Sequence, residues 1–152
     1  MRSIIEAAWE NRDLLKDQST IEVKLAAIPA DNNEVVVIDD LSSGYISNID
    51  NFKDIHFING DIRNINDVKK AMNGVEVVFH LAAQPLVLDS YSNPRETFDI
   101  NMMGTVNLLE VARRVESVKS VLVSTTDKVY KNVENKNKFI ENDPLLGKDP
   151  YS

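Results

Sequence analysis

The stretch EVVVID, residues 34–39, decides the fold class of this chain. Three consecutive valines and an isoleucine, followed by carboxylates, are typical of a short parallel strand that is buried on both faces. Similar apolar runs recur further along the chain, as IHFING, VEVVFHLAA and VKSVLVST. We therefore predict four strands, over residues 34–39, 55–60, 75–82 and 118–125.

Helical patterns separate these runs. Apolar residues recur at helical spacing over 65–72, and Asn73-Gly74 supplies a stop signal after them. A second helix is predicted from about Pro94 to Val115, with Asn93 as its N-cap and Glu96 as a capping glutamate. Strands that alternate with helices indicate βαβ units. The sequence therefore predicts an α/β fold, with an incomplete, Rossmann-like, doubly wound parallel sheet.

The start of the chain does not fit this pattern. A dinucleotide-binding fold has a first strand and a glycine-rich turn about 20 residues before the acid at Asp39. No glycine precedes Gly44, and the opening MRSIIEAAWENRDLLK predicts an amphipathic helix instead. We therefore divide the chain into an atypical, helical N-terminal segment, residues 1–31, and a partial dinucleotide-binding domain, residues 32–152.

Composition excludes several classes of protein. The 152 residues carry a net charge of −7, which argues against nucleic acid or an anionic membrane surface as the main partner. No apolar run reaches the roughly 18 residues of a membrane span. With no cysteine and only His56 and His80, neither disulfides nor a metal site is expected, and a reducing cytoplasm is the expected location.

Polar residues gather where the predicted strands end, and in open parallel sheets ligands bind beyond those ends. They are Asp39, Asp61, the stretch after Leu81, and Ser124 through Lys128. On their own, Asp39 and Asp61 are more often ordinary polar strand ends than binding residues. His80 is expected to be a hydrogen-bonded core histidine, and Asn101 a structural hydrogen-bonding residue within its helix.

Several spaced motifs resemble the nucleotide-binding half of an extended short-chain dehydrogenase/reductase. VVVIDDLSSG and FINGDIR are similar to the stretches that hold the adenosine end of NAD in that superfamily. Four further motifs together resemble the CDP-glucose 4,6-dehydratases: HLAAQPLV, SNPRETFDINMMGTVNLLE, TTDKVY and ENDPLLGKDPYS. The Asp127-Lys128 pair is specific to that branch, because relatives that act on dTDP- or GDP-sugars usually carry a glutamate after the aspartate.

This resemblance implies an enzyme that uses NAD to convert CDP-glucose into CDP-4-keto-6-deoxyglucose. It implies that Tyr151 takes the proton of the 4-hydroxyl group and that Thr126 hydrogen-bonds the same hydroxyl. Asp127 would protonate the departing 6-hydroxyl, and Lys128 would remove the C5 proton. A carboxyl and an amine in these roles must be held in their neutral forms by burial.

The resemblance also implies cofactor contacts and a homodimer. Asp39 would bind the adenosine ribose, Asp61 with Ile62 would edge the adenine, and Ser124 would lie near the nicotinamide. The residues expected to line the dinucleotide are Leu81, Ala82 and Ala83. The homodimer would form through the helix after Pro94, whose apolar residues Phe98, Met102, Val106 and Leu109 we expect to be partly exposed.

Two departures from the family pattern lead us to expect no activity from this chain alone. The glycine-rich turn is replaced, and the lysine that follows the family's tyrosine by four residues would fall beyond Ser152. We therefore expect a truncated or recombined dehydratase sequence. Two alternatives stay open: a UDP-glucose 4-epimerase-like fragment, which VVVIDDLSSG favours, and a non-catalytic interaction module.

Overall fold

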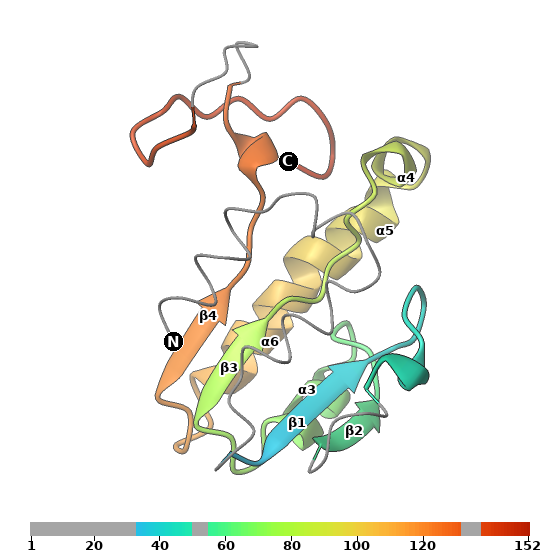
Figure 1. Ribbon diagram of the computed structural model, residues 1–152, viewed down its shortest axis with the longest axis vertical. Coiled ribbons are helices and arrows are strands. Elements are labelled where there is room, and N and C mark those ends of the chain that lie inside the picture. The colour runs from blue at the N-terminus through green and yellow to red at the C-terminus, as the bar shows by residue number, and fades with distance from the viewer. Residues whose placement is uncertain (1–32, 50–54, 132–137) are drawn as a thin grey trace. The chain divides into compact units, whose positions relative to one another are not determined.

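A computed structural model of the chain describes residues 33–49, 55–131 and 138–152 (Figure 1). The predicted N-terminal segment, residues 1–31, lies outside these described residues, and so does its predicted helix. The chain divides after Asn59 into two compact units. The described residues form one pair of parallel strands in each unit.

In the first unit, β1 (Val35–Asp39) pairs with β2 (Ile55–Asn59). The register runs from Val35 opposite Ile55 to Asp39 opposite Asn59. Four of the five residues of β1 are β-branched, and β2 contains two isoleucines and a phenylalanine. Such side chains pack well on a pleated surface. Both predicted strands are confirmed, each one residue shorter. A 3₁₀ turn, η3 (Ile46–Asn48), lies between them in the chain.

In the second unit, β3 (Val77–His80) pairs in parallel with β4 (Ser120–Val123). Both strands are predicted by the sequence, although each is shorter than the predicted 75–82 and 118–125. Further hydrogen bonds continue the ladder beyond both ends. Lys119 N donates to Glu76 O at 2.7 Å, and Ser124 N donates to His80 O at 3.0 Å.

The strand pairing agrees with a doubly wound fold. In the strand order 3-2-1-4-5-6, the third strand pairs with the second and the fourth pairs with the fifth. The pairs β1–β2 and β3–β4 match those two pairs when the four strands are counted as the second to the fifth. The first strand of that order would precede residue 34, and residues 1–32 lie outside the described part of the chain.

The first predicted helix is confirmed as α3 (Ile65–Ala71). Asn64 is its N-cap, because its side chain accepts a hydrogen bond from Asn66 N at 3.0 Å. The helix ends where predicted, since Gly74 takes the left-handed backbone conformation, with φ of 77°.

The second predicted helix is built from three consecutive elements. They are α5 (Pro94–Phe98), the π-helical turn η4 (Asp99–Met103) and α6 (Gly104–Ala112). Asn93 is the N-cap residue and Pro94 follows it at the first helical position, as predicted. The predicted side-chain capping was wrong: the Asn93 side chain makes no capping bond, and Glu96 lies 3.7 Å from Arg63 as an ion pair. The sequence also did not predict α4 (Val87–Ser92), which follows Pro85 without a clear helical period.

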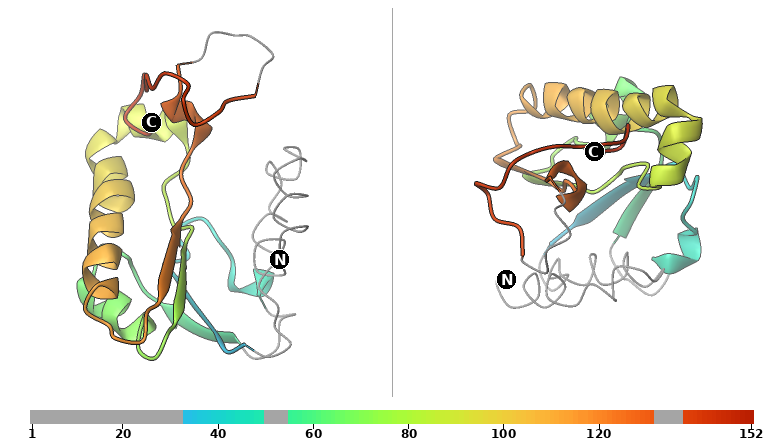
Figure 2. Two further views of the ribbon diagram at one scale, coloured as in Figure 1. Left: turned by 90° about the vertical axis from the view of Figure 1, so that its left-hand side faces the viewer. Right: turned by 90° about the horizontal axis from the view of Figure 1, so that it is seen from above.

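The second unit has its core between these helices and the β3–β4 pair. Figure 2 shows α6 running along one face of β3 and β4, with α5 beyond the ends of the strands. The buried core consists of Ile62, Val68, Met72, Val78, Leu108, Val111 and Ala112. Gly104 brings α6 close to Ile62, because a Cβ at this position would lie 2.4 Å from Ile62 Cδ1. The opposite face of the helix exposes Phe98, Met102, Val106 and Leu109, as predicted.

Candidate functional site

Two chain segments leave the C-terminal end of the β3–β4 pair next to each other. Leu81, Ala82 and Ala83 follow β3, and Ser124 follows β4. The bond from Ser124 N to His80 O ties the two segments together where the strands end. All four side chains are exposed. The small side chains of the two alanines leave the backbone open to a close approach by a ligand.

The Thr126-Asp127-Lys128 motif forms a tight turn beyond β4. Thr126 is the N-cap of η5 (Asp127–Val129), and its Oγ1 accepts a hydrogen bond from Lys128 N at 3.2 Å. The Thr126 hydroxyl keeps its own proton for donation to another group. The side chains of Asp127 and Lys128 are exposed. The burial that their predicted acid and base roles require is therefore not supplied by the described part of the chain.

Backbone hydrogen bonds hold the segment that carries Tyr151 beside η5. Lys131 N donates to Pro144 O at 2.7 Å, and Leu146 N donates to Val129 O at 2.8 Å. The rings of Tyr130 and Phe139 stack with their centroids 5.0 Å apart. All views in Figures 1 and 2 place the C-terminus beside η5.

Tyr151 itself lies in a capped turn. Its backbone N–H and that of Ser152 each donate to Asp149 Oδ1 at 3.0 Å. The Tyr151 side chain is half-buried. The structure thus brings the segments that hold all four predicted catalytic residues to one end of the β3–β4 pair.

Asp61 and Ile62 form a turn that Arg63 and α6 hold in place. The Arg63 guanidinium donates to both Asp61 carboxylate oxygens, at 2.8 and 3.0 Å from Nε. These hydrogen bonds lower the pKa of Asp61 below its ordinary value. The Ile62 side chain is buried against Gly104. Only the main chain of Ile62 is therefore available to contact the edge of a ligand.

Asp39 ends β1 in the first unit. Its Oδ1 accepts a hydrogen bond from Leu41 N at 2.7 Å, and Leu41 has a positive φ of 57°. The neighbouring Asp40 makes the equivalent bond to Ser42 N at 2.9 Å. Both carboxylates therefore shape the turn, and Asp39 is the more buried of the two.

A chain of polar contacts, centred on Gln84, joins the segment after β3 to the helix. Asn101 Oδ1 accepts from Gln84 N at 2.7 Å, and Asn101 Nδ2 donates to Gln84 O at 3.0 Å. The Gln84 side chain reaches Thr97 Oγ1 at 3.1 Å. Sequence reasoning gave Asn101 a structural role, which is confirmed, but it missed Gln84 because a single glutamine carries no periodic signal.

His80 continues this polar region at the end of β3. It is buried, and its Nε2 lies 2.7 Å from Thr105 Oγ1, which donates to Asn101 O at 2.6 Å. Burial lowers the pKa of His80. The prediction of a hydrogen-bonded core histidine is confirmed.

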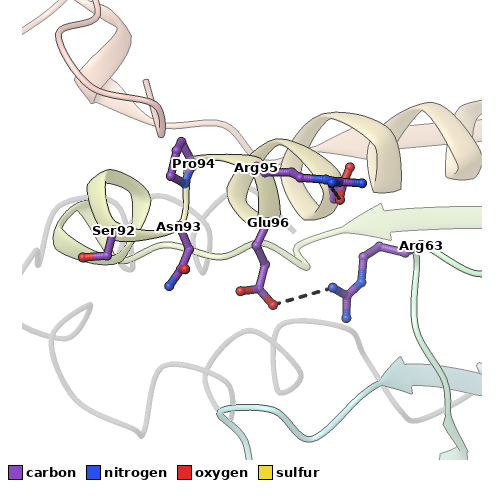
Figure 3. Close-up of a pocket in the computed structure, with 7 residues that line it drawn as sticks. Arg63, Ser92, Asn93, Pro94, Arg95 and Glu96 are labelled. Carbon is purple, nitrogen blue, oxygen red and sulfur yellow. Dashed lines mark ion pairs between the residues drawn. The ribbon is translucent and has the colours of Figure 1, made fainter.

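A separate pocket of about 430 Å³ opens beside Arg63 and the start of α5. Figure 3 shows Glu96 pointing toward Arg63 across it. The pocket contains none of the predicted catalytic residues. Its charges pair with each other, Arg63 with Glu96 at 3.7 Å and Arg95 with Asp99 at 3.8 Å, so it offers no concentrated charge to an anion or a cation.

The described residues show neither a metal cluster nor a membrane span. Within residues 33–49, 55–131 and 138–152, no three histidine, aspartate or glutamate side chains gather closely enough to hold a metal ion. In the same ranges, no helix is long and apolar enough to cross a membrane.

Comparison with known proteins agrees with this geometry. Residues 26–152 match the profile of the family described as GDP-mannose 4,6 dehydratase. The chain is 42% identical over 124 residues to CDP-glucose 4,6-dehydratase of Salmonella typhimurium, which covers 78% of this chain and 30% of that enzyme. It is 38% identical over 121 residues to a putative UDP-glucose 4-epimerase of Methanocaldococcus jannaschii, covering 79% and 39%.

Among solved structures, the chain is similar to DesIV, the dTDP-glucose 4,6-dehydratase of Streptomyces venezuelae, solved with NAD and TYD bound. The TM-score is 0.74 at 29% identity, covering 88% of this chain and 42% of DesIV. The chain therefore spans less than half the length of these relatives. The match confirms an incomplete Rossmann-like fold, and the chain belongs to the nucleotide-sugar 4,6-dehydratase and epimerase family of extended short-chain dehydrogenases/reductases.

Proposed function

We propose that this chain is the NAD-binding half of a nucleotide-sugar 4,6-dehydratase whose substrate is CDP-glucose. The observation that carries the proposal is the Asp127-Lys128 pair in η5, directly after β4 and beside the segment that holds Tyr151. The 42% identity to a CDP-glucose 4,6-dehydratase supports the same substrate. The absence of cysteine supports a cytoplasmic location.

The described residues fit a bound dinucleotide at the end of the β3–β4 pair. Ala82 and Ala83 are exposed there and present backbone with little side chain. We propose that Leu81, Ala82 and Ala83 line the dinucleotide, with Ser124 near its nicotinamide. The Ile62 main chain beside Asp61 would edge the adenine, and Asp39 would accept hydrogen bonds from the ribose hydroxyls. NAD, when bound, supplies reversible hydride acceptance.

In the proposed mechanism, the protein's own residues move the protons. Tyr151 takes the proton of the 4-hydroxyl, while Thr126 donates a hydrogen bond to that oxygen. Lys128 removes the C5 proton, and Asp127 protonates the 6-hydroxyl as it leaves as water. Each positioned proton donor or acceptor typically contributes about 10²–10⁴ in rate. Because Asp127 and Lys128 are exposed, we infer that bound substrate and further protein surface bury them in the working enzyme.

We expect the 152-residue polypeptide alone to bind NAD more weakly than about millimolar and to show no turnover. No glycine precedes Gly44, so the sequence lacks the glycine-rich turn that in dinucleotide-binding folds lets the pyrophosphate approach the backbone donors of a helix start, where the helix dipole contributes about 0.3–1 kcal/mol per charge. The chain also covers only 30% of the CDP-glucose 4,6-dehydratase that it resembles.

Two chimeras test the proposal. Replacing residues 1–31 with a glycine-rich first βα unit should raise NAD affinity, as measured by calorimetry. In that chimera Asp39→Ala should lower the affinity again, whereas Asp40→Ala, which disturbs the same turn, should not. Equal losses in both variants would show that the turn matters and that the Asp39 carboxylate does not bind the ribose.

Adding the C-terminal half of the Salmonella relative should give turnover of CDP-glucose. Lys128→Ala should abolish that turnover, and Lys131→Ala is the matched control, since only the Lys131 backbone makes a described contact. Turnover that survives Lys128→Ala would refute the assigned base.

A second candidate function is that of a UDP-glucose 4-epimerase. The 38% identity to a putative enzyme of that type favours it. An epimerase has no elimination to catalyse, so the Asp127-Lys128 pair would be without a role. The completed chimera should therefore be assayed with UDP-glucose as well. Epimerisation without dehydration of CDP-glucose would replace the first proposal with this one.

A further inference from the structure

One helix contacts both main-chain segments that the proposed function assigns to the cofactor. Asn101, in η4, binds the main chain of Gln84, next to the Leu81–Ala83 segment. Asn107, in α6, donates from Nδ2 to Ile62 O at 3.1 Å and to Arg63 O at 3.0 Å. We propose that Asn101 and Asn107 are positioning residues that set the register of these two segments relative to each other.

The Asn101 contact is a two-point clamp. Its amide group uses both the acceptor and a donor on the N–H and C=O of a single residue, Gln84. A side-chain amide has an acceptor oxygen at one side and a donor nitrogen at the other. The pairing therefore fixes the direction of the Gln84 main chain as well as its distance from the helix. The Gln84 side chain adds a third point at Thr97 Oγ1.

The π-helical turn explains how one helix makes these contacts in line. Thr97, Asn101 and Thr105, four residues apart, all contact β3 or the segment that follows it. In a regular α-helix, with 3.6 residues per turn, side chains four residues apart point in progressively different directions around the helix axis. The i+5 hydrogen bond from Gly104 N to Asp99 O widens the turn and reduces that drift. Such π-turns occur frequently at functional sites.

The Asn107 contact holds the second segment at a different place on the helix. Its amide nitrogen bridges two consecutive carbonyl oxygens, those of Ile62 and Arg63. The close approach of Gly104 to the Ile62 side chain supports the same segment from beside it. The helix therefore holds each segment through a different asparagine, so the two can be released separately.

Residue-resolved amide exchange of the full chain by NMR tests this separation. Asn101→Ala should speed exchange of the Gln84 N–H about tenfold, the effect of losing roughly one net hydrogen bond, and should leave the Asn64 N–H unchanged. Asn107→Ala should do the reverse, speeding exchange of Asn64 N–H, which bonds to Asp61 O at 2.9 Å. Glu110→Ala, on the same helix, is the control, because its carboxylate pairs with Arg113 and Arg114.

A merely structural role gives a different pattern. Loss of general stability would speed exchange at both segments and in the core of α6 together, in either variant, and that result would overturn the proposal. If Asn101→Ala does not fold, Asn101→Leu serves instead. It keeps nearly the same side-chain size but has neither the acceptor for Gln84 N nor the donor to Gln84 O, so the Gln84 N–H should exchange faster than in the wild type, and unchanged exchange would overturn the clamp.

The consequence for the cofactor rests on the proposed function and is measured separately. NAD added to the wild type at concentrations well above millimolar should shift the amide signals of Ala82 and Ala83. The absence of any shift would count against the proposed function alone, because the exchange measurements need no NAD. Where shifts occur, Asn101→Ala should reduce them at Ala82 and Ala83. If the Gln84 N–H exchanges faster in Asn101→Ala but NAD shifts Ala82 and Ala83 as much as in the wild type, the positioning role is overturned.

Discussion

Replacing Gly104 with alanine should destabilise the second unit, although alanine is the better helix former. The new Cβ would lie 2.4 Å from Ile62 Cδ1 and 2.7 Å from Ile62 Cγ1, well inside van der Waals contact. Ile62 cannot move away freely, because its side chain is buried and Asn107 holds its carbonyl. Overpacking of this kind costs about 1–3 kcal/mol, against a gain in helix propensity of about 0.8–1 kcal/mol.

We therefore expect Gly104→Ala to lower the free energy of unfolding by about 1 kcal/mol, measured by urea denaturation followed by circular dichroism. Ile62→Val removes the Cδ1 atom in the path of the new methyl group and by itself should cost about 0.5–1.5 kcal/mol. The double variant should be more stable than the sum of the two single effects predicts, by about 1 kcal/mol. If Gly104→Ala instead stabilises the protein by the gain of about 0.8–1 kcal/mol expected from helix propensity, the close packing of α6 against Ile62 is refuted.

Three further predictions concern pH, association and activity. Burial lowers the pKa of His80 in the folded state, so the stability due to neutral His80 should be complete above the unfolded pKa of about 6.5 and should fall as the pH drops below it. If the melting temperature of His80→Gln falls with acid as much as that of the wild type, this expectation is contradicted. The exposed apolar face that includes Met102 should drive self-association, which light scattering should show to weaken in Met102→Glu; a wild type that stays monomeric at high concentration would count against it. Calorimetry should find NAD binding to the unmodified chain weaker than about millimolar, and micromolar binding would show that residues 1–31 replace the glycine-rich turn.

The sequence predicted the strands and the first helix because their signals are local. A run of valine and isoleucine defines β1, the apolar residues Ile55, Phe57 and Ile58 mark β2, and Gly74 marks the end of α3 by its backbone conformation. The N-cap position of Asn93 was predicted correctly, but the capping role of Glu96 was wrong because a tertiary contact decides it: the Glu96 side chain pairs with Arg63. The π-turn also has no sequence signature, since it depends on what the helix faces.

The position of the candidate site could be predicted from the sequence, but the side-chain contacts that hold its segments in place could not. The polar residues after β3 and β4 lie together because parallel strands end at the same edge. Asn101, Asn107 and Gln84 are common surface residue types, and the contacts of the two asparagines with Gln84 and Ile62 span 17 and 45 residues along the chain. Such long-range pairs leave no periodic pattern. The exposure of Asp127 and Lys128 could not be predicted either, because it depends on which surfaces cover η5.

The polar chain at the end of β3 has a direction. The Thr105 hydroxyl has one proton and donates it to Asn101 O, so we infer that His80 Nε2 carries the hydrogen that reaches Thr105 Oγ1. In the neutral ring Nδ1 is then the basic nitrogen, and an added proton goes there. Acid would therefore charge the far side of the imidazole while leaving the Nε2 bond to Thr105 intact. The fold would weaken through a buried cation before the hydrogen bonds that hold Gln84 are broken.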